Sequence, residues 1–92
     1  MQMDIELKTL KIMLAIEQEG SISKAAKVLY ISQPALTQYI KRMESTLSFL
    51  LYNRENGKCI PTKAGKILLE EGKVLLEQYN AMLKKANDTA NS

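Results

Sequence analysis

The chain has 92 residues, 46% of them hydrophobic, and a net charge of +3 at pH 7, which suits one small domain with a modest core and is too short for two. It contains no histidine and a single cysteine, Cys59, so histidine-dependent catalysis, a multi-cysteine metal cluster and an intramolecular disulfide are excluded, and we expect neither an enzyme nor a metal or cofactor. The uninterrupted apolar runs are only a few residues long, far below the roughly 20 that span a bilayer, so a cytoplasmic protein without membrane contact is expected.

The first predicted element is a helix over residues 4–19, where apolar residues recur at helical spacing on a broad face. Asp4 and Glu6 favour its N-terminus, because acidic side chains interact well with the positive end of the helix dipole. Gly20 is expected to end the helix, as a glycine just past a helix end commonly does. We interpret this helix as scaffold and assign no site to it.

Residues 21–47 predict two short helices that meet at an angle. Ser21 and Ser23 are candidate N-caps, and the first helix is expected to start near Ser23. Its apolar face consists of Ala25, Ala26 and Leu29. Ser32, followed by Gln33 and Pro34, is the start signal of the second helix, because proline is tolerated at the first helical positions.

The second helix has one apolar stripe and a polar remainder. The stripe, at spacings of four, three and four, is Leu36, Ile40, Met43 and Leu47. The outward side chains are Gln33, Thr37, Gln38, Lys41 and Arg42, which combine groups that can read base edges with cations that can meet phosphates. Tyr39 is expected to pack its ring on the scaffold and offer its hydroxyl to a phosphate. Two amphipathic helices are also ordinary all-α architecture, so spacing alone leaves both interpretations open.

Residues 48–61 predict two short strands around a tight loop. The apolar run Phe49-Leu50-Leu51-Tyr52 precedes the loop, and Cys59-Ile60-Pro61 follows it. Asn56-Gly57 favours a hairpin because both positions tolerate positive φ. We interpret Cys59 as a small strand residue rather than a redox sensor, because the sequence indicates no basic partner with a defined geometry.

The last predicted element is a helix from Thr62, its N-cap, to about Lys85, with a length on the order of 35 Å. A heptad-like seam runs along it, four and three residues apart: Leu68, Gly72, Leu75, Tyr79 and Met82. A flanking row follows at sevens: Leu69, Leu76 and Leu83. These rows predict self-association, with Gly65 and Gly72 allowing close backbone approach; the alternative is that the rows pack on the first helix.

The run EGSISKAAKVLYISQPALTQYIKRME, residues 19–44, resembles the N-terminal winged helix-turn-helix of the LysR-type bacterial transcriptional regulators. The most recognisable parts are Glu19-Gly20-Ser21, Ala25-Ala26 and Ser32-Gln33-Pro34-Ala35-Leu36, and the likeness continues through Leu47, Arg54 and Thr62-Lys63-Ala64-Gly65. It implies a mainly α fold. The implied parts are a winged helix-turn-helix with a three-helix core and a two-stranded wing (residues 1–61), a long C-terminal linker helix (residues 62–86) and a flexible tail (residues 87–92).

The resemblance implies sequence-specific binding of double-stranded DNA in transcription regulation. The binding form would be a homodimer, joined through the C-terminal helix, on an interrupted inverted repeat, with the recognition helix in the major groove and the wing near the minor groove. Regulators of this family usually carry a second domain for a small-molecule inducer, of which nothing is present in these residues, and a full-length regulator could form a tetramer. The alternatives are a winged helix used only for protein interaction or dimerisation, and a different winged-helix family such as the MarR-like regulators.

The family pattern also implies a set of DNA-binding residues. Base readout is expected from Gln33, Pro34, Thr37 and Gln38. Phosphate contacts are expected from Ser23, Ser32, Lys41 and Arg42, and the set is completed by Ser21, Lys24 and, in the wing, Arg54 and Lys58. The alternative for Arg54 is a structural ion pair or strand-end hydrogen bond. Gln38 stands where the family usually has arginine, and an amide suits adenine better than guanine.

The charge distribution agrees with this interpretation. Residues 21–66 carry eight basic and two acidic side chains, a net charge of +6, in a chain whose total is +3. Local cations are what release counterions from DNA, so their position matters more than the total. A solvated basic surface is the alternative.

Overall fold

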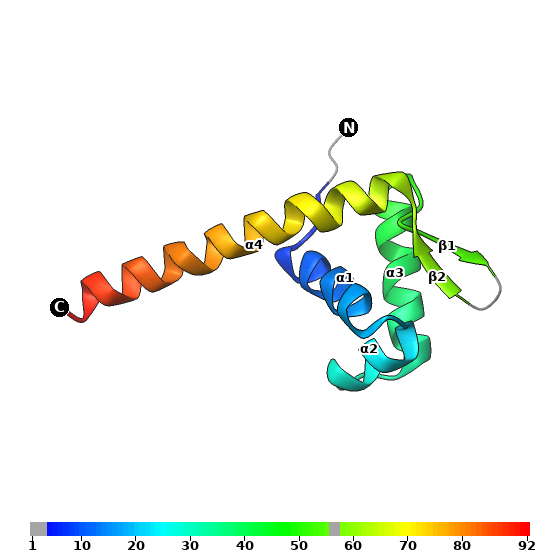
Figure 1. The fold of residues 1–92 in the computed structure, drawn as a ribbon, viewed down its shortest axis with the longest axis horizontal. Coiled ribbons are helices and arrows are strands. Elements are labelled where there is room, and N and C mark those ends of the chain that lie inside the picture. The colour runs from blue at the N-terminus through cyan, green and yellow to red at the C-terminus, as the bar shows by residue number, and fades with distance from the viewer. Residues whose placement is uncertain (1–3, 56–57) are drawn as a thin grey trace.

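The computed structural model describes residues 4–55 and 58–92. Its elements, in chain order, are α1 (Leu7–Glu19), α2 (Ile22–Val28), α3 (Gln33–Leu47), β1 (Tyr52–Glu55), β2 (Lys58–Pro61) and α4 (Lys63–Ala90). The three short helices and the hairpin form one body, from which the long helix α4 extends (Figure 1). The predicted mainly helical winged helix-turn-helix is confirmed.

Helix α1 begins later than expected and ends where expected. Its N-cap is Glu6, whose side chain makes no capping hydrogen bond, so Asp4 lies before the helix rather than in its first turn. Gly20 adopts a left-handed conformation, with φ of 81°, and its N–H donates to the carbonyl of Ile16. A glycine takes this conformation without a Cβ penalty, which explains why α1 ends at this position.

Serine hydroxyls start the next two helices. Of the two candidates, Ser21 caps α2: its Oγ accepts from the N–H of Lys24 at 3.1 Å, and the helix begins at Ile22, one residue before the expected start near Ser23. Ser32 caps α3 as predicted, accepting from the N–H of Ala35 at 3.1 Å. Between the two helices, Tyr30 takes a positive φ of 59°, and this tight turn sets α3 at an angle to α2.

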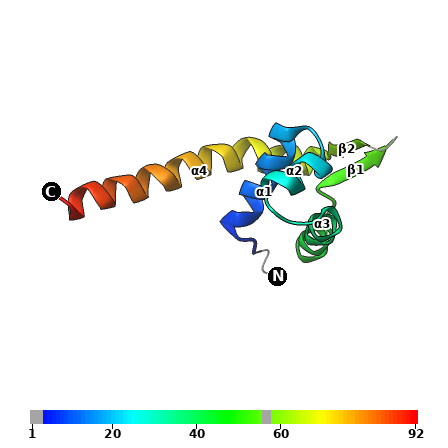
Figure 2. The ribbon, with the colours of Figure 1, turned by 90° about the horizontal axis from the view of Figure 1, so that it is seen from below.

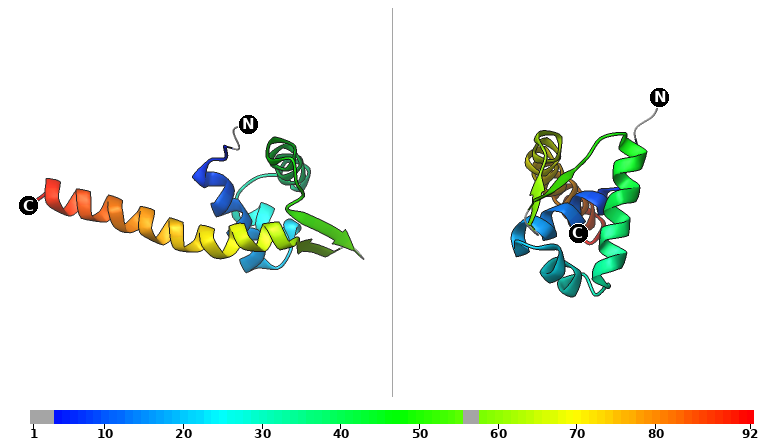
Figure 3. Two further views of the ribbon diagram at one scale, coloured as in Figure 1. Left: turned by 90° about the horizontal axis from the view of Figure 1, so that it is seen from above. Right: turned by 90° about the vertical axis from the view of Figure 1, so that its right-hand side faces the viewer.

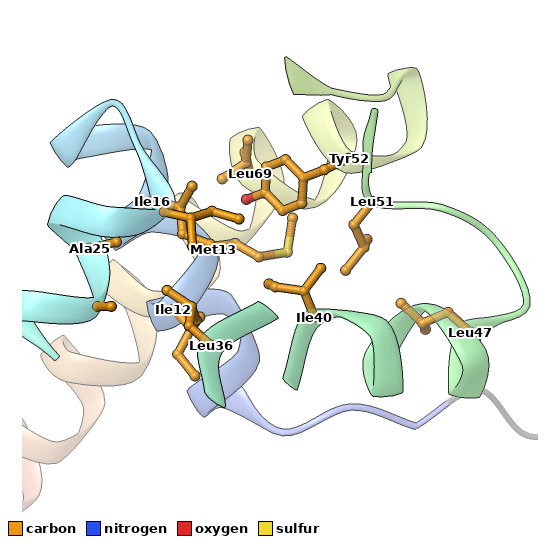
Figure 4. Packing of buried hydrophobic residues seen from close by; sticks show 12 residues of the cluster. Ile12, Met13, Ile16, Ala25, Leu36, Ile40, Leu47, Leu51, Tyr52 and Leu69 are labelled. Atoms are coloured by element: carbon orange, nitrogen blue, oxygen red, sulfur yellow. The ribbon is translucent and has the colours of Figure 1, made fainter. Parts of the chain in front are cut away.

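The core lies between α1, α2, α3, the first residues of the wing and Leu69 of α4 (Figure 4). Met13, Leu36 and Leu51 have no exposed surface. Ala25 and Ala26 are also buried, as small residues at a close helix crossing should be. The predicted α3 stripe is buried at Leu36, Ile40 and Leu47, whereas Met43 is only partly buried against the cluster.

The wing is a two-stranded hairpin. Strand β1 pairs with β2 antiparallel, from Tyr52 opposite Pro61 to Glu55 opposite Lys58. The first strand starts at Tyr52 rather than earlier in the apolar run, because Leu51 turns into the core. The predicted Asn56-Gly57 turn lies outside the described residues.

Thr62 joins the wing to α4. As predicted, it is the N-cap, accepting from the N–H of Gly65 at 3.0 Å. Its Oγ1 also donates to the carbonyl of Leu50 at 2.7 Å, and its N–H donates to the carbonyl of Leu51 at 2.9 Å. The start of α4 is therefore held against the segment that enters the wing.

Helix α4 packs on α1 through its first half only. Leu69 and Leu76 are buried, so the alternative in which these leucines pack within the chain is the correct one for them. A Cβ at Gly72 would lie 2.9 Å from Cδ2 of Leu10, and one at Gly65 would collide with the carbonyl of Leu51. Both glycines thus allow close approach inside the chain, which corrects their assignment to close approach between subunits.

The second half of α4 extends away from the domain (Figure 1). Every residue from Asn80 to Ser92 is exposed, and the helix continues to Ala90. The expected end near Lys85 was therefore too early, and residues 87–90 are helical rather than a tail. A Lys84–Asp88 ion pair at 2.7 Å bridges successive turns there. None of the described helices has the length and apolarity to cross a membrane.

Candidate nucleic-acid interface

The exposed face of α3 is polar and begins at the first residue of the helix. Burying the apolar stripe on α1 and α2 turns the opposite side outward along the edge of the domain (Figure 3). The exposed residues of this face, with the N-cap, are Ser32, Gln33, Pro34, Gln38, Lys41 and Arg42. The structure therefore presents two amides and two cations on one surface, which is the combination that base readout with phosphate contacts requires.

Arg54 links the wing to α3. Its Nη2 donates to Oγ1 of Thr37 at 3.2 Å, and Thr37 is half-buried while Arg54 is exposed. The contact is a structural hydrogen bond of the kind weighed as the alternative for Arg54. The accepting Thr37 hydroxyl keeps its own proton for donation, because a hydroxyl is both donor and acceptor. Arg54 and Thr37 thus lie together at the junction of wing and helix.

The two capping serines keep a donor for a ligand. Each Oγ accepts a backbone N–H in its cap, but each O–H proton is left available. Ser23 and Lys24 are exposed on α2. Ser21 and Ser32 therefore combine a role in helix formation with a free hydroxyl proton near the helix starts.

The Tyr39 hydroxyl forms a hydrogen bond inside the domain. The hydroxyl lies 2.8 Å from Oγ1 of Thr9, which has no exposed surface. Thr9 Oγ1 also lies 3.5 Å from Sδ of Met43, and either hydroxyl can be the donor in the bond between the two oxygens. The phosphate contact expected of this hydroxyl stays a prediction, and it would have to form beside the existing bond to the buried Thr9.

Two residues that join distant parts of the fold, Glu44 and Thr9, were not predicted from the sequence. Oε2 of Glu44 accepts from the N–H of Leu51 at 2.7 Å and from that of Tyr52 at 3.2 Å, which ties the end of α3 to the base of the wing. Thr9 holds Tyr39 as described above. The available signal for Thr9 was a single polar residue within the apolar pattern of α1; nothing in the local sequence distinguishes Glu44 from an exposed helix carboxylate.

The two other wing residues of interest, Lys58 and Cys59, both lie on β2. Lys58 is exposed at the start of β2. Cys59 is half-buried, and burial raises the pKa of its thiol, an effect that the Arg54 charge partly offsets. A raised pKa keeps the thiol protonated and poorly reactive, which favours the interpretation of Cys59 as a strand residue.

The predicted seam on α4 is divided by the fold. Gly72 is buried, Leu68 and Tyr79 are half-buried, and Leu75 and Met82 are exposed. An apolar groove between the start of α1 and α4 includes Leu75 in its lining, together with Ile5, Leu7, Leu10, Ile67, Leu68 and Val74. Of the two exposed seam residues, Leu75 thus borders a groove that the domain itself leaves open, whereas Met82 lies beyond it.

Known sequences resemble this chain over its helix-turn-helix and wing. The model of a family described as bacterial regulatory helix-turn-helix proteins, lysR family, matches residues 7–66. A probable RuBisCO transcriptional regulator from Phaeodactylum tricornutum is 47% identical over 64 residues, 70% of this chain and 21% of that protein. The uncharacterized HTH-type transcriptional regulator YbhD from Escherichia coli is 46% identical over 66 residues, 72% of this chain and 21% of that protein. The chain spans about a fifth of the length of these curated relatives.

Solved structures resemble it over nearly its whole length. The crystal structure of BenM_DBD with catB site 1 DNA has a TM-score of 0.87 and 29% identity, covering 95% of this chain and 94% of that one. The CbnR_DBD–DNA complex gives 0.83 and 29%, covering 94% and 99%. Full-length CbnR with its target DNA gives 0.79 and 29%, covering 90% of this chain and 29% of that one.

Proposed function

The chain belongs to the LysR family of bacterial regulatory helix-turn-helix proteins, and from this membership we propose that it is a sequence-specific DNA-binding domain of a transcriptional regulator, binding double-stranded DNA as a homodimer. The observation that carries the proposal is the exposed polar face of α3, which is flanked by a wing hydrogen-bonded to it through Arg54 and Thr37. The similar structures in complex with DNA support it. The proposal includes that the chain binds DNA rather than catalysing a reaction, and that it does so in the cytoplasm.

The roles of the interface residues follow from their chemistry and exposure. We assign base readout in the major groove to Gln33, Pro34, Thr37 and Gln38. We assign backbone phosphates to the hydroxyls and cations of Ser21, Ser23, Lys24, Ser32, Lys41 and Arg42. Arg54 and Lys58 belong to the wing near the minor groove, where Arg54 also positions Thr37. Phosphate contacts fix the register on the duplex, and base contacts supply the specificity.

Dimer formation is proposed through α4. Leu75 and Met82 are exposed apolar residues of the predicted seam, with Leu68 and Tyr79 at its edge. Gly72 contributes indirectly, because it brings α4 close to α1. Two domains joined in this way would place two copies of α3 on one side of a duplex, which predicts an inverted repeat. Residues 1–61 would then be the reading unit and residues 62–86 the linker; an inducer response and tetramer formation would belong to a longer regulator.

Selection from a random duplex library at two salt concentrations tests the proposed function. We expect enrichment of an inverted repeat with one fixed half-site spacing, together with weaker retention at the higher salt concentration. Salt-sensitive retention without an enriched sequence would refute base readout by α3. Absence of duplex binding, or binding that ignores salt, would refute the DNA-binding role and favour a protein-interaction module.

A further inference from the structure

Two cations from different helices flank one aromatic ring beside α3. Nζ of Lys8, on α1, lies 5.6 Å from the centre of the Tyr39 ring, and Cζ of Arg42, on α3, also lies 5.6 Å from it. The hydroxyl of Tyr39 is bonded to the buried Thr9 at 2.8 Å, which anchors the far end of the ring against α1. The Tyr39 ring therefore contacts both a lysine of α1 and an arginine of α3.

Neither cation is neutralised within the described part of the chain. The ion pair among the described residues joins Lys84 to Asp88 near the C-terminal end of α4, and no described carboxylate forms an ion pair with Lys8 or Arg42. The acids nearest in sequence are Asp4 and Glu6, which are exposed, and Glu44, whose Oε2 accepts from backbone amides at the base of the wing. The ring attracts each cation weakly, whereas two like charges repel, so the pair carries an uncompensated positive charge that suits an anion.

This pair extends the proposed interface to α1. Figures 2 and 3 show the first turn of α1 next to α3 on the same edge of the domain, with the wing on the other side of α3. Arg54 contacts the side of α3 that carries Thr37, whereas Lys8 lies on the side that carries Tyr39. A duplex against α3 would meet cations from both flanks.

We propose that Lys8 and Arg42 form a binding site for a backbone phosphate of DNA, with Tyr39 as the residue that positions both cations. The inference rests on the proposed function and adds to it a contact from α1, a helix to which the sequence assigned no site. Because a phosphate is the same in every sequence, the site contributes affinity and salt dependence without base preference.

The test compares Lys8→Gln with Lys11→Gln. Lys11 lies on the same helix, is exposed, and has its Nζ 6.0 Å from the ring centre of Tyr79 on α4, so its variant removes the same charge and the same type of aromatic contact away from α3. Dissociation constants are measured by fluorescence anisotropy on a selected and a scrambled duplex over a potassium chloride series. Circular dichroism melting verifies that both variants are folded.

For Lys8→Gln we expect the slope of log Kd against log salt to fall by about 0.9 for each protomer bound, with the same fold-loss on both duplexes. Lys11→Gln should keep the wild-type slope. The phosphate site would be overturned if Lys8→Gln kept the wild-type slope, or if the slope fell equally in Lys8→Gln and Lys11→Gln. In either case, a wild-type preference for the selected duplex over the scrambled one would still support the proposed function. A wild-type protein without salt-dependent duplex binding would overturn both.

Discussion

Removing the Glu44 carboxylate should weaken the attachment of the wing to α3. Its Oε2 accepts two N–H groups, at 2.7 Å from Leu51 and 3.2 Å from Tyr52, and both of these residues are buried. A hydrogen bond to a charged group contributes about 1.5–3 kcal/mol, and an unsatisfied buried amide costs about 1–3 kcal/mol. Counting the shorter bond fully and the longer one in part, Glu44→Ala should lower the free energy of unfolding by about 3 kcal/mol.

The assay is urea unfolding at fixed protein concentration, followed by circular dichroism, because the proposed dimer would make apparent stability depend on concentration. Glu17→Ala is the matched control: it removes a carboxylate from the last turns of α1, where the side chain is exposed and makes no hydrogen bond within the described residues, and it should change stability by less than about 0.5 kcal/mol. Glu44→Gln, which keeps a neutral acceptor, should lie between the two. A Glu44→Ala protein as stable as the Glu17→Ala protein would refute the argument that the carboxylate anchors the wing.

The other predictions concern the glycines, the reading face and the dimer. Gly65→Ala should lower the free energy of unfolding by more than about 2 kcal/mol, because its Cβ would collide with a backbone carbonyl. Gly72→Ala should change it by less than about 1 kcal/mol, because its Cβ would meet only the end of a leucine side chain and alanine adds up to about 1 kcal/mol in helix propensity. Equal unfolding free energies for the two variants would contradict this. Gln38→Ala should lose about 1–3 kcal/mol of discrimination at one base pair, whereas Lys41→Ala should weaken all sequences alike; competition with single-base operator variants distinguishes them. Leu75→Glu should yield folded monomers in sedimentation equilibrium, since this leucine is 49% exposed, and a dimer of unchanged affinity would exclude it from the interface.

Local signals in the sequence located several helix boundaries correctly. Ser32 and Thr62 cap their helices, and Gly20 ends α1, because each of these features depends on hydrogen bonds within a few residues of the chain. Ser21 shows the limit of this reasoning: two serines lay within capping distance, and only the backbone conformation of the folded chain selected one of them. The exposed candidates on α3 were likewise predictable, since a buried stripe leaves the opposite face outward.

The contacts between distant segments required the tertiary structure. Periodicity indicates that a helix face is apolar without saying what covers it, so the α4 rows left two alternatives, and only the fold placed Leu69, Leu76 and Gly72 against the rest of the domain. The same holds for Tyr39, whose hydroxyl partner on α1 is 30 residues away in the chain, and for Glu44 at the base of the wing. Hydrogen bonds and side-chain packing across such separations depend on how the helices are set against one another, which no short stretch of sequence encodes.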